Sequence, residues 1–464
     1  MIDVANKRVT VMGLGLSGGG VGVAQWLLKH GAIVTVTDLK PEEQLRDSIA
    51  AVKSVGMPVE FALGKHREQD FTDTDLVIKN PGVPDGSPYL QAARKAKVLI
   101  DTDIGIFVQN FPGTIAGVTG TKGKTTTTTL LHKLCQATGR NVLLGGNLRK
   151  SPLDDLDNAT SDTLAVLELS SFQLEIFKQH KFSPHIAVWT NLYPDHLDRY
   201  KTMREYAAAK SHIMVYQKKD DVFITSADQA ELVKLSKKAK GQVVLCSAKK
   251  RITGGLYLAA GKYISELSGQ PEVLAELSKV KLRGQHNVLN ILQAMAAAQA
   301  LQVPAQTIRE VTEGFTGVAN RLQSVRTVKG VEYVNDTAST IPSSVIAALN
   351  AFDQPIVLIA GGSEKNLPLE EMAAAVLTKV KKVVLLETPV GLAVAELMAQ
   401  QDPTNAKGLI DKPFARSMRD AVQQASVLAQ KGDVVLLSPG AASFGMFRNE
   451  FDRGDQFVAA VKAL

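Results

Sequence analysis

A glycine-rich turn between an apolar strand and a helix constrains this chain more than any other feature. The run Val118-Thr-Gly-Thr-Lys-Gly-Lys-Thr-Thr126 follows an expected strand, 114–118, and precedes a helix expected over 125–138. The spacing is that of a phosphate-binding loop, in which N–H groups surround phosphates, a lysine neutralises charge and a hydroxyl ligates Mg²⁺. Val118 stands where the strict pattern has its first glycine, so the loop is a variant. The chain is therefore expected to bind ATP in an α/β domain.

The first forty residues predict a second kind of nucleotide site. A strand over 8–12 leads into Gly13-Leu-Gly-Leu-Ser-Gly18, then a helix, then a strand over 33–37 that ends at Asp38. This GxGxxG spacing allows close approach of a phosphate to the helix N-terminus, and Asp38 is placed to reach a ribose hydroxyl. Alone, the pattern fits an NAD-dependent dehydrogenase as well as a protein that binds a nucleoside-diphosphate sugar.

Strands and helical patterns alternate along the rest of the chain, which predicts an α/β fold with mainly parallel sheets. We expect three domains, with a Rossmann-like N-terminal domain, a central P-loop ATPase domain and a Rossmann-like C-terminal domain. Their expected ranges are 1–111, 112–317 and 318–464. The later expected strands are 75–78, 163–167, 185–190, 221–225, 242–246, 331–334, 355–360, 382–386 and 433–437, with an Ala- and Leu-rich helix over 284–301.

Composition excludes several classes of function. The 464 residues carry a net charge of +7, but aromatic residues make up only 5%, so a nucleic-acid surface with stacking aromatics is not expected. No apolar run reaches the roughly 18 residues needed to span a bilayer, and no signal peptide is recognisable. We therefore expect a cytoplasmic protein without membrane insertion. Cys135 and Cys246 lie outside any CxxC pattern and are expected to be buried.

Two further side chains follow expected strands of the central domain. Glu168 stands at the carboxyl end of one strand and His196 lies in the loop after another. Ligands of open α/β sheets bind at this edge, so Glu168 is a candidate Mg²⁺ ligand beside the phosphate loop. Lys210, taken alone, is typical of a solvated helix residue.

Motifs spread over the whole chain resemble those of the Mur ligases of peptidoglycan synthesis. The resemblance implies three domains and an ATP-dependent amide synthesis through an acyl phosphate. It is greatest to members that join D-glutamate to UDP-N-acetylmuramoyl-L-alanine. The motifs are Gly120-Thr-Lys-Gly-Lys-Thr125, Leu167-Glu-Leu-Ser-Ser-Phe-Gln-Leu-Glu175, Asp195-His-Leu-Asp-Arg-Tyr200, Tyr206-Ala-Ala-Ala-Lys210, Gly284-Gln-His-Asn-Val-Leu-Asn290 and Ser438-Pro-Gly-Ala-Ala-Ser-Phe444.

The same resemblance implies the catalytic centre and its cofactors, which are ATP and two Mg²⁺ ions. Thr125 and Glu168 would hold one ion, and His196 and Lys210 the other. A free ammonium repels a metal, so Lys210 is expected to be carbamylated. The implied catalytic residues are Lys124, Glu168, His196 and Lys210.

Binding residues are carried over in three sets, and the protein is expected to be a monomer. The ATP set is Gly120, Thr121, Lys122, Gly123, Lys124, Thr125, Thr126, Asn287, Asn290, Arg321 and Asp336. The UDP-substrate set is Gly15, Leu16, Ser17, Asp38, Lys40, Gly82, Asn147 and His196. The amino-acid set is Thr340, Lys365, Ser443 and Phe444.

Four departures from the family pattern leave the identity of the amino acid open. Ala338 replaces a common lysine, and Asn320-Arg-Leu-Gln323 stands where the family usually has His-Arg-x-Glu. Gly445 replaces a frequent Asp, and Glu450 replaces an aromatic residue. One alternative is a Mur-type ligase for another amino acid or acceptor. Other classes are a dehydrogenase using the first glycine motif and a non-catalytic nucleotide-binding protein.

Overall fold

The computed structural model describes residues 3–15, 18–148, 151–196, 199–365 and 367–464. It divides into two compact units, each described separately. Unit 1 is Met1–Lys279 with Val288–Glu313, and unit 2 is Val280–Asn287 with Gly314–Leu464. Within the described ranges, no helix is both long and apolar enough to cross a membrane.

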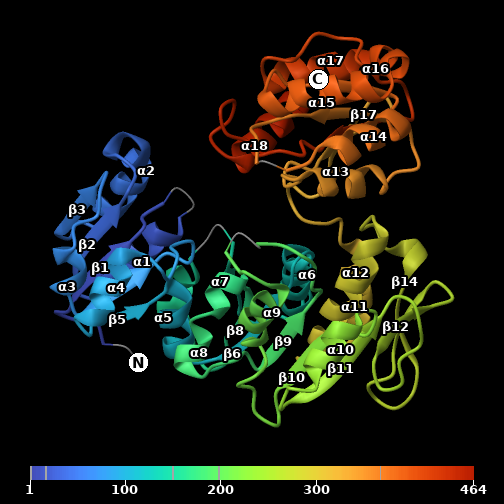
Figure 1. Ribbon diagram of the computed structural model, residues 1–464. Helices are drawn as coiled ribbons and strands as arrows, with labels where there is room; N and C mark the ends of the chain where they lie inside the picture. Colours follow the sequence, from blue (N-terminus) through green and yellow to red (C-terminus); the bar gives the residue numbers. More distant parts are fainter. Residues whose placement is uncertain (1–2, 16–17, 149–150, 197–198, 366) are drawn as a thin grey trace. The chain divides into compact units, whose positions relative to one another are not determined.

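Unit 1 begins with a five-stranded parallel sheet in the order β3-β2-β1-β4-β5 (Figure 1). The Val, Ile, Leu and Thr residues of the three inner strands suit burial on both faces, whereas the two edge strands are more exposed. The strands are β1 (Arg8–Met12), β2 (Ile33–Asp38), β3 (Val59–Leu63), β4 (Leu76–Lys79) and β5 (Leu99–Asp101). The helices are α1 (Gly19–Lys29), α2 (Glu42–Lys53), α3 (Gln69–Thr72), α4 (Pro88–Lys95) and α5 (Asp103–Asn110).

The second sheet of unit 1 has nine strands in the order β14-β13-β12-β11-β10-β9-β6-β8-β7. Strands β6 to β12 pair with one another in parallel. The β12–β13 and β13–β14 pairs are antiparallel. The strands are β6 (Thr114–Thr119), β7 (Val142–Gly146), β8 (Leu164–Glu168), β9 (Ile186–Trp189), β10 (Val222–Ser226), β11 (Gln242–Ser247), β12 (Leu256–Ala259), β13 (Lys262–Ser265) and β14 (Glu272–Glu276).

Helices connect these strands and place the functional loops at the carboxyl edge of the sheet. Ser170 begins α7 with a reciprocal capping box to Gln173, and the Thr202 hydroxyl caps α9. The helices are η1 (Pro152–Asn158), α6 (Lys124–Gln136), α7 (Ser171–Leu174), α8 (Phe177–His180), α9 (Met203–Ser211), α10 (Ala230–Ser236), η2 (Leu277–Lys279), α11 (Gln285–Ala300) and α12 (Ala305–Gly314).

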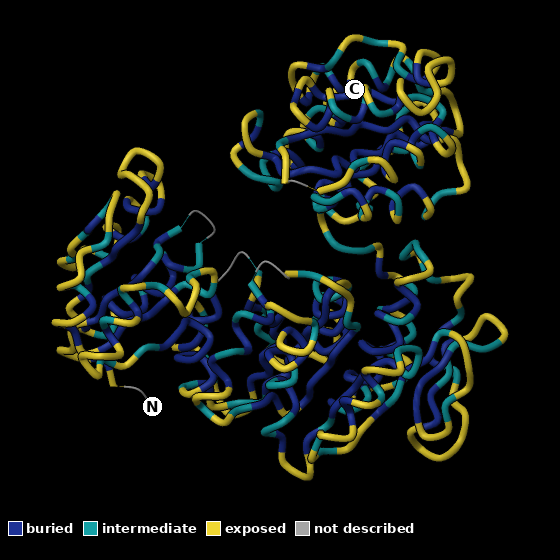
Figure 2. Tube along the Cα trace, in the orientation of Figure 1, coloured by how far each residue is buried: buried dark blue, intermediate teal, exposed yellow. Residues whose placement is uncertain are grey.

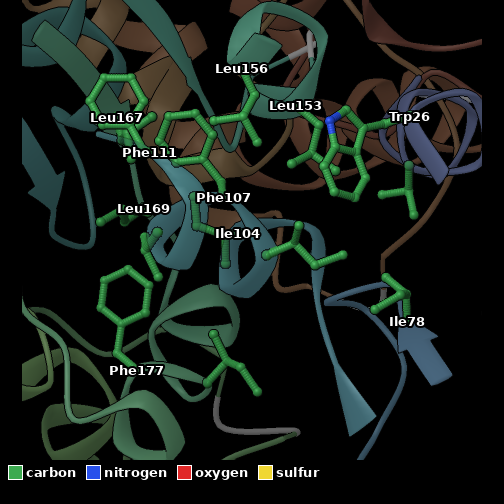
Figure 3. Close-up of a cluster of buried hydrophobic side chains, with 14 of the residues drawn as sticks. Trp26, Ile78, Ile104, Phe107, Phe111, Leu153, Leu156, Leu167, Leu169 and Phe177 are labelled. Atoms are coloured by element: carbon green, nitrogen blue, oxygen red, sulfur yellow. The ribbon is translucent and has the colours of Figure 1, made fainter. Parts of the chain in front are cut away.

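One hydrophobic core joins the two sheets of unit 1. Figure 3 shows Trp26 of α1 and Phe107 of α5 in one cluster with Leu156 of η1 and Leu167 of β8. Trp26 also donates its indole N–H to Asp157 at 3.2 Å. Burying this apolar surface stabilises the two sheets as a single unit. The expected boundary at residue 111 stays a prediction, since the core runs across it.

Unit 2 contains a five-stranded sheet in the order β15-β16-β19-β17-β18, with only β15 antiparallel. Figure 2 shows four of its strands as mostly buried, while the edge strand β15 is partly exposed. The strands are β15 (Gln323–Val328), β16 (Val331–Asn335), β17 (Ile356–Ala360), β18 (Lys382–Leu385) and β19 (Val434–Leu437). The helices are α13 (Pro342–Leu349), α14 (Glu370–Lys379), α15 (Pro389–Gln401), α16 (Pro403–Leu409), α17 (Met418–Leu428) and α18 (Glu450–Lys462).

The three-domain α/β fold class is confirmed, and the predicted strands lie within about one residue of their observed bounds. Both cysteines are buried, as expected. The sequence analysis did not identify β3, β5, β7, β15 or the β12–β14 segment. These strands are short or lie at sheet edges, where apolar alternation is weak.

Candidate active site

The phosphate loop joins β6 to α6 and contains two glycines that cannot be replaced without strain. Gly120 has φ 151° and Gly123 has φ 79°, both in the region that disfavours other residues. A β-carbon on Gly120 would collide with the Thr190 hydroxyl, and one on Gly123 would collide with the Asn290 amide. The two glycines therefore let the loop pack closely against Thr190 and Asn290 where it enters α6.

Lys124 is the first residue of α6 and folds back over the phosphate loop. Its ammonium donates hydrogen bonds to the carbonyl oxygens of Gly120 and Thr121, at 3.1 and 3.2 Å. The next two residues, Thr125 and Thr126, lie in the first turn of the helix, and Thr126 is buried. This arrangement places a positive charge and two hydroxyl groups at a helix N-terminus that favours anions.

Glu168 ends β8, next to β6 in the sheet, and its side chain is buried. Asn147 donates from Nδ2 to Glu168 Oε1 at 2.8 Å. Among the described residues, no group makes a hydrogen bond to the other carboxylate oxygen, Oε2. A buried carboxylate oxygen without a hydrogen-bond donor fits a cation ligand, so the residues present suit Mg²⁺.

Lys210 is buried in α9, contrary to the solvated position expected of it in isolation. Its ammonium donates to Gly120 O at 3.0 Å, the carbonyl that also accepts from Lys124. It lies 4.7 Å from the ring centroid of Tyr206. Burial lowers the pKa of Lys210 well below its usual value, and the charge of Lys124 lowers it further.

His196 lies in the loop after β9, with a positive φ of 54°. Its ring centroid is 4.9 Å from that of Phe172 and 6.1 Å from that of Tyr206. The Tyr206 ring therefore lies near both His196 and the Lys210 ammonium. Within the described part of the chain, no three His, Cys, Asp or Glu side chains form a metal site by themselves.

The N-terminal glycine loop is held by Asp38. The Asp38 carboxylate accepts from the N–H of Gly15 at 3.0 Å and from the N–H of Lys40 at 2.9 Å. Asp38 is buried and binds both main-chain groups, so it fixes the shape of the glycine loop. Its contact with a ribose stays a prediction. The predicted contacts Leu16 and Ser17 lie outside the described residues.

The other predicted UDP-substrate residues lie in exposed turns of unit 1. Gly82 donates its N–H to Asn80 Oδ1 at 3.0 Å, in the turn that follows β4. The guanidinium of Arg199 donates to Pro81 O in the same turn, at 3.1 Å. Arg199 also pairs with Glu175 at 3.0 Å and lies 4.2 Å from the Phe172 ring centroid. The turn after β4 is thereby linked to the loop that contains His196.

In unit 2, Asp336 follows β16, and both of its carboxylate oxygens accept hydrogen bonds. It accepts from the N–H of Leu322 at 3.1 Å, from the Ser438 hydroxyl at 3.0 Å and from the Ser339 hydroxyl. Burial raises the pKa of Asp336 to about 6, against the opposing effect of those hydrogen bonds. These contacts fix the segment that contains the exposed Arg321. Asn287, also in unit 2, donates to Arg283 O at 2.5 Å.

Of the four predicted amino-acid residues, Lys365 lines a small pocket of unit 2, and Thr340, Ser443 and Phe444 are not part of its lining. Lys365 donates to the Thr340 hydroxyl at 3.1 Å, and Ser443 is buried while Phe444 is 63% exposed. The pocket combines apolar walls with polar groups of the loop after β17. It is lined by Pro342, Ser363, Glu364, Lys365, Leu367, Leu369, Val390, Gly440 and Ala441.

The sequence analysis did not identify Arg453, which binds the main chain of Ala441 in the pocket lining. Arg453 of α18 is fully buried and donates to the hydroxyl and carbonyl oxygens of Thr337, both at 3.0 Å. It also donates to the carbonyls of Ala441 and Ala442, at 3.1 and 3.4 Å. Arg453 follows two acidic residues in a helix, so its sequence is typical of a surface.

The phosphate loop, the carboxylate at the end of the neighbouring strand and the three α/β sheets define an ATP-using enzyme. Family models match almost the whole chain: "Mur ligase MurD-like, N-terminal domain" over 7–101, "Mur ligase middle domain" over 118–298 and "Mur ligase, glutamate ligase domain" over 320–440. The chain belongs to the Mur ligase family. It is therefore an ATP-dependent amide ligase of peptidoglycan synthesis, and the dehydrogenase alternative loses its support.

Two relatives that match the chain over its full length share one name. The chain is 43% identical over 470 residues to a UDP-N-acetylmuramoylalanine--D-glutamate ligase of Roseiflexus sp. (strain RS-1), covering 100% of both chains. It is 38% identical to a protein of that name from Koribacter versatilis, covering 100% of this chain and 99% of the relative.

Solved structures share the fold at lower identity. UDP-N-acetylmuramate-alanine ligase MurC from Thermotoga maritima matches with a TM-score of 0.63 at 21% identity, covering 98% of this chain and 99% of that one. MurF from Acinetobacter baumannii matches with a TM-score of 0.61 at 17% identity, covering 99% and 94%.

Proposed function

We propose that the protein joins the amine of D-glutamate to the free carboxyl group of UDP-N-acetylmuramoyl-L-alanine with hydrolysis of ATP to ADP and phosphate. The observation that carries this proposal is the 43% identity, over the full length, to a relative named for that reaction. Both substrates are small molecules, and we propose that the protein acts as a cytoplasmic monomer.

The proposed chemistry has two steps. A carboxylate oxygen of the acceptor attacks the γ-phosphorus and ADP leaves, which forms an acyl phosphate. The amine of D-glutamate then attacks the acyl carbon, phosphate leaves and the nitrogen loses a proton. Both steps crowd negative oxygens together, and Lys124 with the N-terminus of α6 would offset that charge. Mg²⁺ supplies further charge neutralisation when bound.

Two Mg²⁺ positions are part of the proposal. Thr125 and Glu168 would hold one ion, which the Oε2 atom of Glu168 supports because it has no hydrogen-bond partner among the described residues. His196 and a carbamylated Lys210 would hold the second. For ATP, the UDP substrate and the amino acid, we propose the same contact residues that the resemblance implied in the sequence analysis.

The lowered pKa of Lys210 supports its carbamylation. A neutral amine attacks CO₂, forms an N–C bond and releases one proton, which leaves an anionic carbamate. Burial and the nearby charge of Lys124 both favour the neutral amine. Protein grown or equilibrated with ¹³C-bicarbonate should show a carbamate carbon signal that is absent from Lys210→Met. Absence of the signal in both proteins would refute the modification.

Phosphate release tests the overall reaction. We expect release to require ATP, UDP-N-acetylmuramoyl-L-alanine and D-glutamate together, with a product whose mass includes one glutamyl residue. Release that does not depend on the amino acid would refute the proposal. The second candidate function is a Mur-type ligase for another amino acid or acceptor, because Ala338 and Glu450 depart from the family pattern near the amino-acid residues. A panel of amino acids and acceptors in the same phosphate-release assay tests it.

A further inference from the structure

A side-chain amide holds the main chain of the phosphate loop. The N–H of Lys122 donates to Asn191 Oδ1 at 2.8 Å, and Asn191 Nδ2 donates back to Lys122 O at 2.9 Å. The Thr190 hydroxyl donates to the same carbonyl at 2.7 Å. Both polar main-chain groups of Lys122 are therefore satisfied by the segment that follows β9.

The phosphate loop holds that segment in return. The N–H of Tyr193 donates to Thr121 Oγ1 at 2.9 Å, and the same hydroxyl lies 3.2 Å from Tyr193 O, to which it donates. The N–H of Thr121 also donates to Asn191 O at 3.1 Å. Thr121 is buried and Tyr193 is exposed, so these bonds are partly shielded from water.

A second amide anchors the post-β9 segment from its other side. The N–H of Leu192 donates to Gln229 Oε1 at 2.9 Å, and Gln229 Nε2 donates to Leu192 O at 3.2 Å. Gln229 stands immediately before α10, in the loop after β10. A primary amide has one acceptor and a donor group at the spacing of a peptide, which is why it can bind both groups of one residue.

We propose that Asn191 and Gln229 are positioning residues that hold the phosphate loop and the post-β9 segment as one preorganised unit for nucleotide binding. Neither residue has a role in the reaction proposed above, and within the described ranges both amides bind main-chain groups only. The post-β9 segment continues to Asp195 and His196, so fixing Leu192 also fixes where those side chains begin. The inference rests on the proposed function, since it assumes that ATP binds this loop.

Trp189 provides a spectroscopic reporter of this unit. It is fully buried and donates its indole N–H to Asn191 O at 3.1 Å. The chain contains two tryptophans, so a Trp26→Phe background leaves Trp189 as the sole indole. Fluorescence of that background then reports both MgADP binding and the access of acrylamide to the post-β9 segment.

The test compares two glutamines that flank β10, Gln217 before the strand and Gln229 after it. Gln229→Met keeps the shape of the side chain and removes both hydrogen bonds to Leu192. Gln217→Met is the matched control, because Gln217 is buried and its Nε2 donates to Pro184 O and Val222 O, both at 3.0 Å, at the opposite end of β10. Both variants are expected to lose thermal stability.

Only Gln229→Met should raise the Kd for MgADP and the KM for ATP, by about tenfold. It should also increase acrylamide quenching of Trp189, and saturating MgADP should reverse that increase. Wild-type affinity in Gln229→Met, or equal weakening in Gln217→Met, would overturn the inference. If Gln229→Met does not fold, Gln229→Glu replaces it, because it keeps the acceptor for Leu192 N–H and loses the donor.

The proposed function can fail separately from this inference. Wild-type protein that binds MgADP but releases no phosphate with D-glutamate would refute the proposed reaction and leave the comparison of glutamines valid. Wild-type protein that shows no Trp189 response and no affinity for MgADP would overturn the inference as well.

Discussion

Asn147 Nδ2 lies 2.8 Å from Glu168 Oε1, and this hydrogen bond orients a buried carboxylate whose second oxygen has no hydrogen-bond partner among the described residues. The side chain is thereby held in one rotamer with Oε2 left for another ligand. Asn147 directly follows β7 and Glu168 ends the adjacent strand β8, so the pairing of these strands sets their spacing.

Glu168→Gln should abolish most activity with little loss of stability. The glutamine oxygen can still accept from Asn147, but an NH₂ group replaces Oε2 and cannot ligate Mg²⁺. We expect kcat to fall by about 10²-fold or more and the Mg²⁺ concentration for half-maximal rate to rise. Asn147→Ala keeps the carboxylate, so its kcat should fall only about tenfold. Unchanged Mg²⁺ dependence in Glu168→Gln would exclude a role in metal binding.

Arg199→Lys should weaken binding of the UDP substrate selectively. The lysine keeps a positive charge but cannot contact Pro81 O, Glu175 and Phe172 together, because it lacks the planar fork. We expect the KM for the acceptor to rise about tenfold and the KM for ATP to stay the same. Arg204→Lys, an exposed change on α9, is the control. An equal rise in both KM values would contradict the prediction.

Asp103→Asn should remove a pH dependence of stability. Burial raises the pKa of Asp103 to about 6, and the charge of Asp101 raises it too. The native state therefore keeps this proton up to about pH 6, while the unfolded chain loses it near pH 3.8. The stability present below about pH 4 is lost as the pH rises through 6, an effect of roughly 3 kcal/mol.

Urea unfolding at pH values from 4 to 8 checks this prediction. Asp103→Asn keeps an oxygen to accept from Ile104 N–H, and its unfolding free energy should be higher than that of the wild type above pH 6. The exposed change Asp162→Asn should leave the pH profile unchanged. A wild-type profile that stays flat between pH 4 and 6 would show that Asp103 does not titrate there.

Arg453→Met should destabilise unit 2 by about 3–5 kcal/mol. The change leaves the Thr337, Ala441 and Ala442 carbonyls without their buried donor. Burial lowers the pKa of Arg453 to about 10, so the side chain is still charged at neutral pH. Arg448→Met, at an exposed ion pair in the same segment, should cost less than about 1 kcal/mol. Chemical denaturation of both variants decides the comparison.

The sequence predicted the elements whose pattern is local. Strands such as 114–119 are apolar runs with a motif directly after them, so their ends and the phosphate loop were recognisable. Strands β12 and β13 have four residues each and form a hairpin through Ala260-Gly261, both with positive φ. The turn was not recognised because it lacks the Asn-Gly or Asp-Gly pair that marks such loops.

Site residues whose environment depends on distant segments were not predictable in the same way. Lys210 lies in a helix of mixed polarity, and only the approach of Thr119 and Gly120, about 90 residues earlier in the chain, shows that it is buried. Asp38 matches a ribose-binding position in sequence, yet its two oxygens bind main-chain groups of the loop before it and of its own turn. Gln229 has no motif, since its role depends on the return of the chain after β9.

The chain passes between the two units three times, because Val280–Asn287 belongs to unit 2 and Val288–Glu313 belongs to unit 1. The crossing at residue 287 falls inside α11, whose later turns lie under the phosphate loop, where Thr127 Oγ1 donates to Asn290 O at 3.5 Å. A truncated protein that stops at residue 279 would lose this support for the nucleotide-binding helix. Expression of the ATPase portion as an independent fragment therefore requires an end point after Glu313.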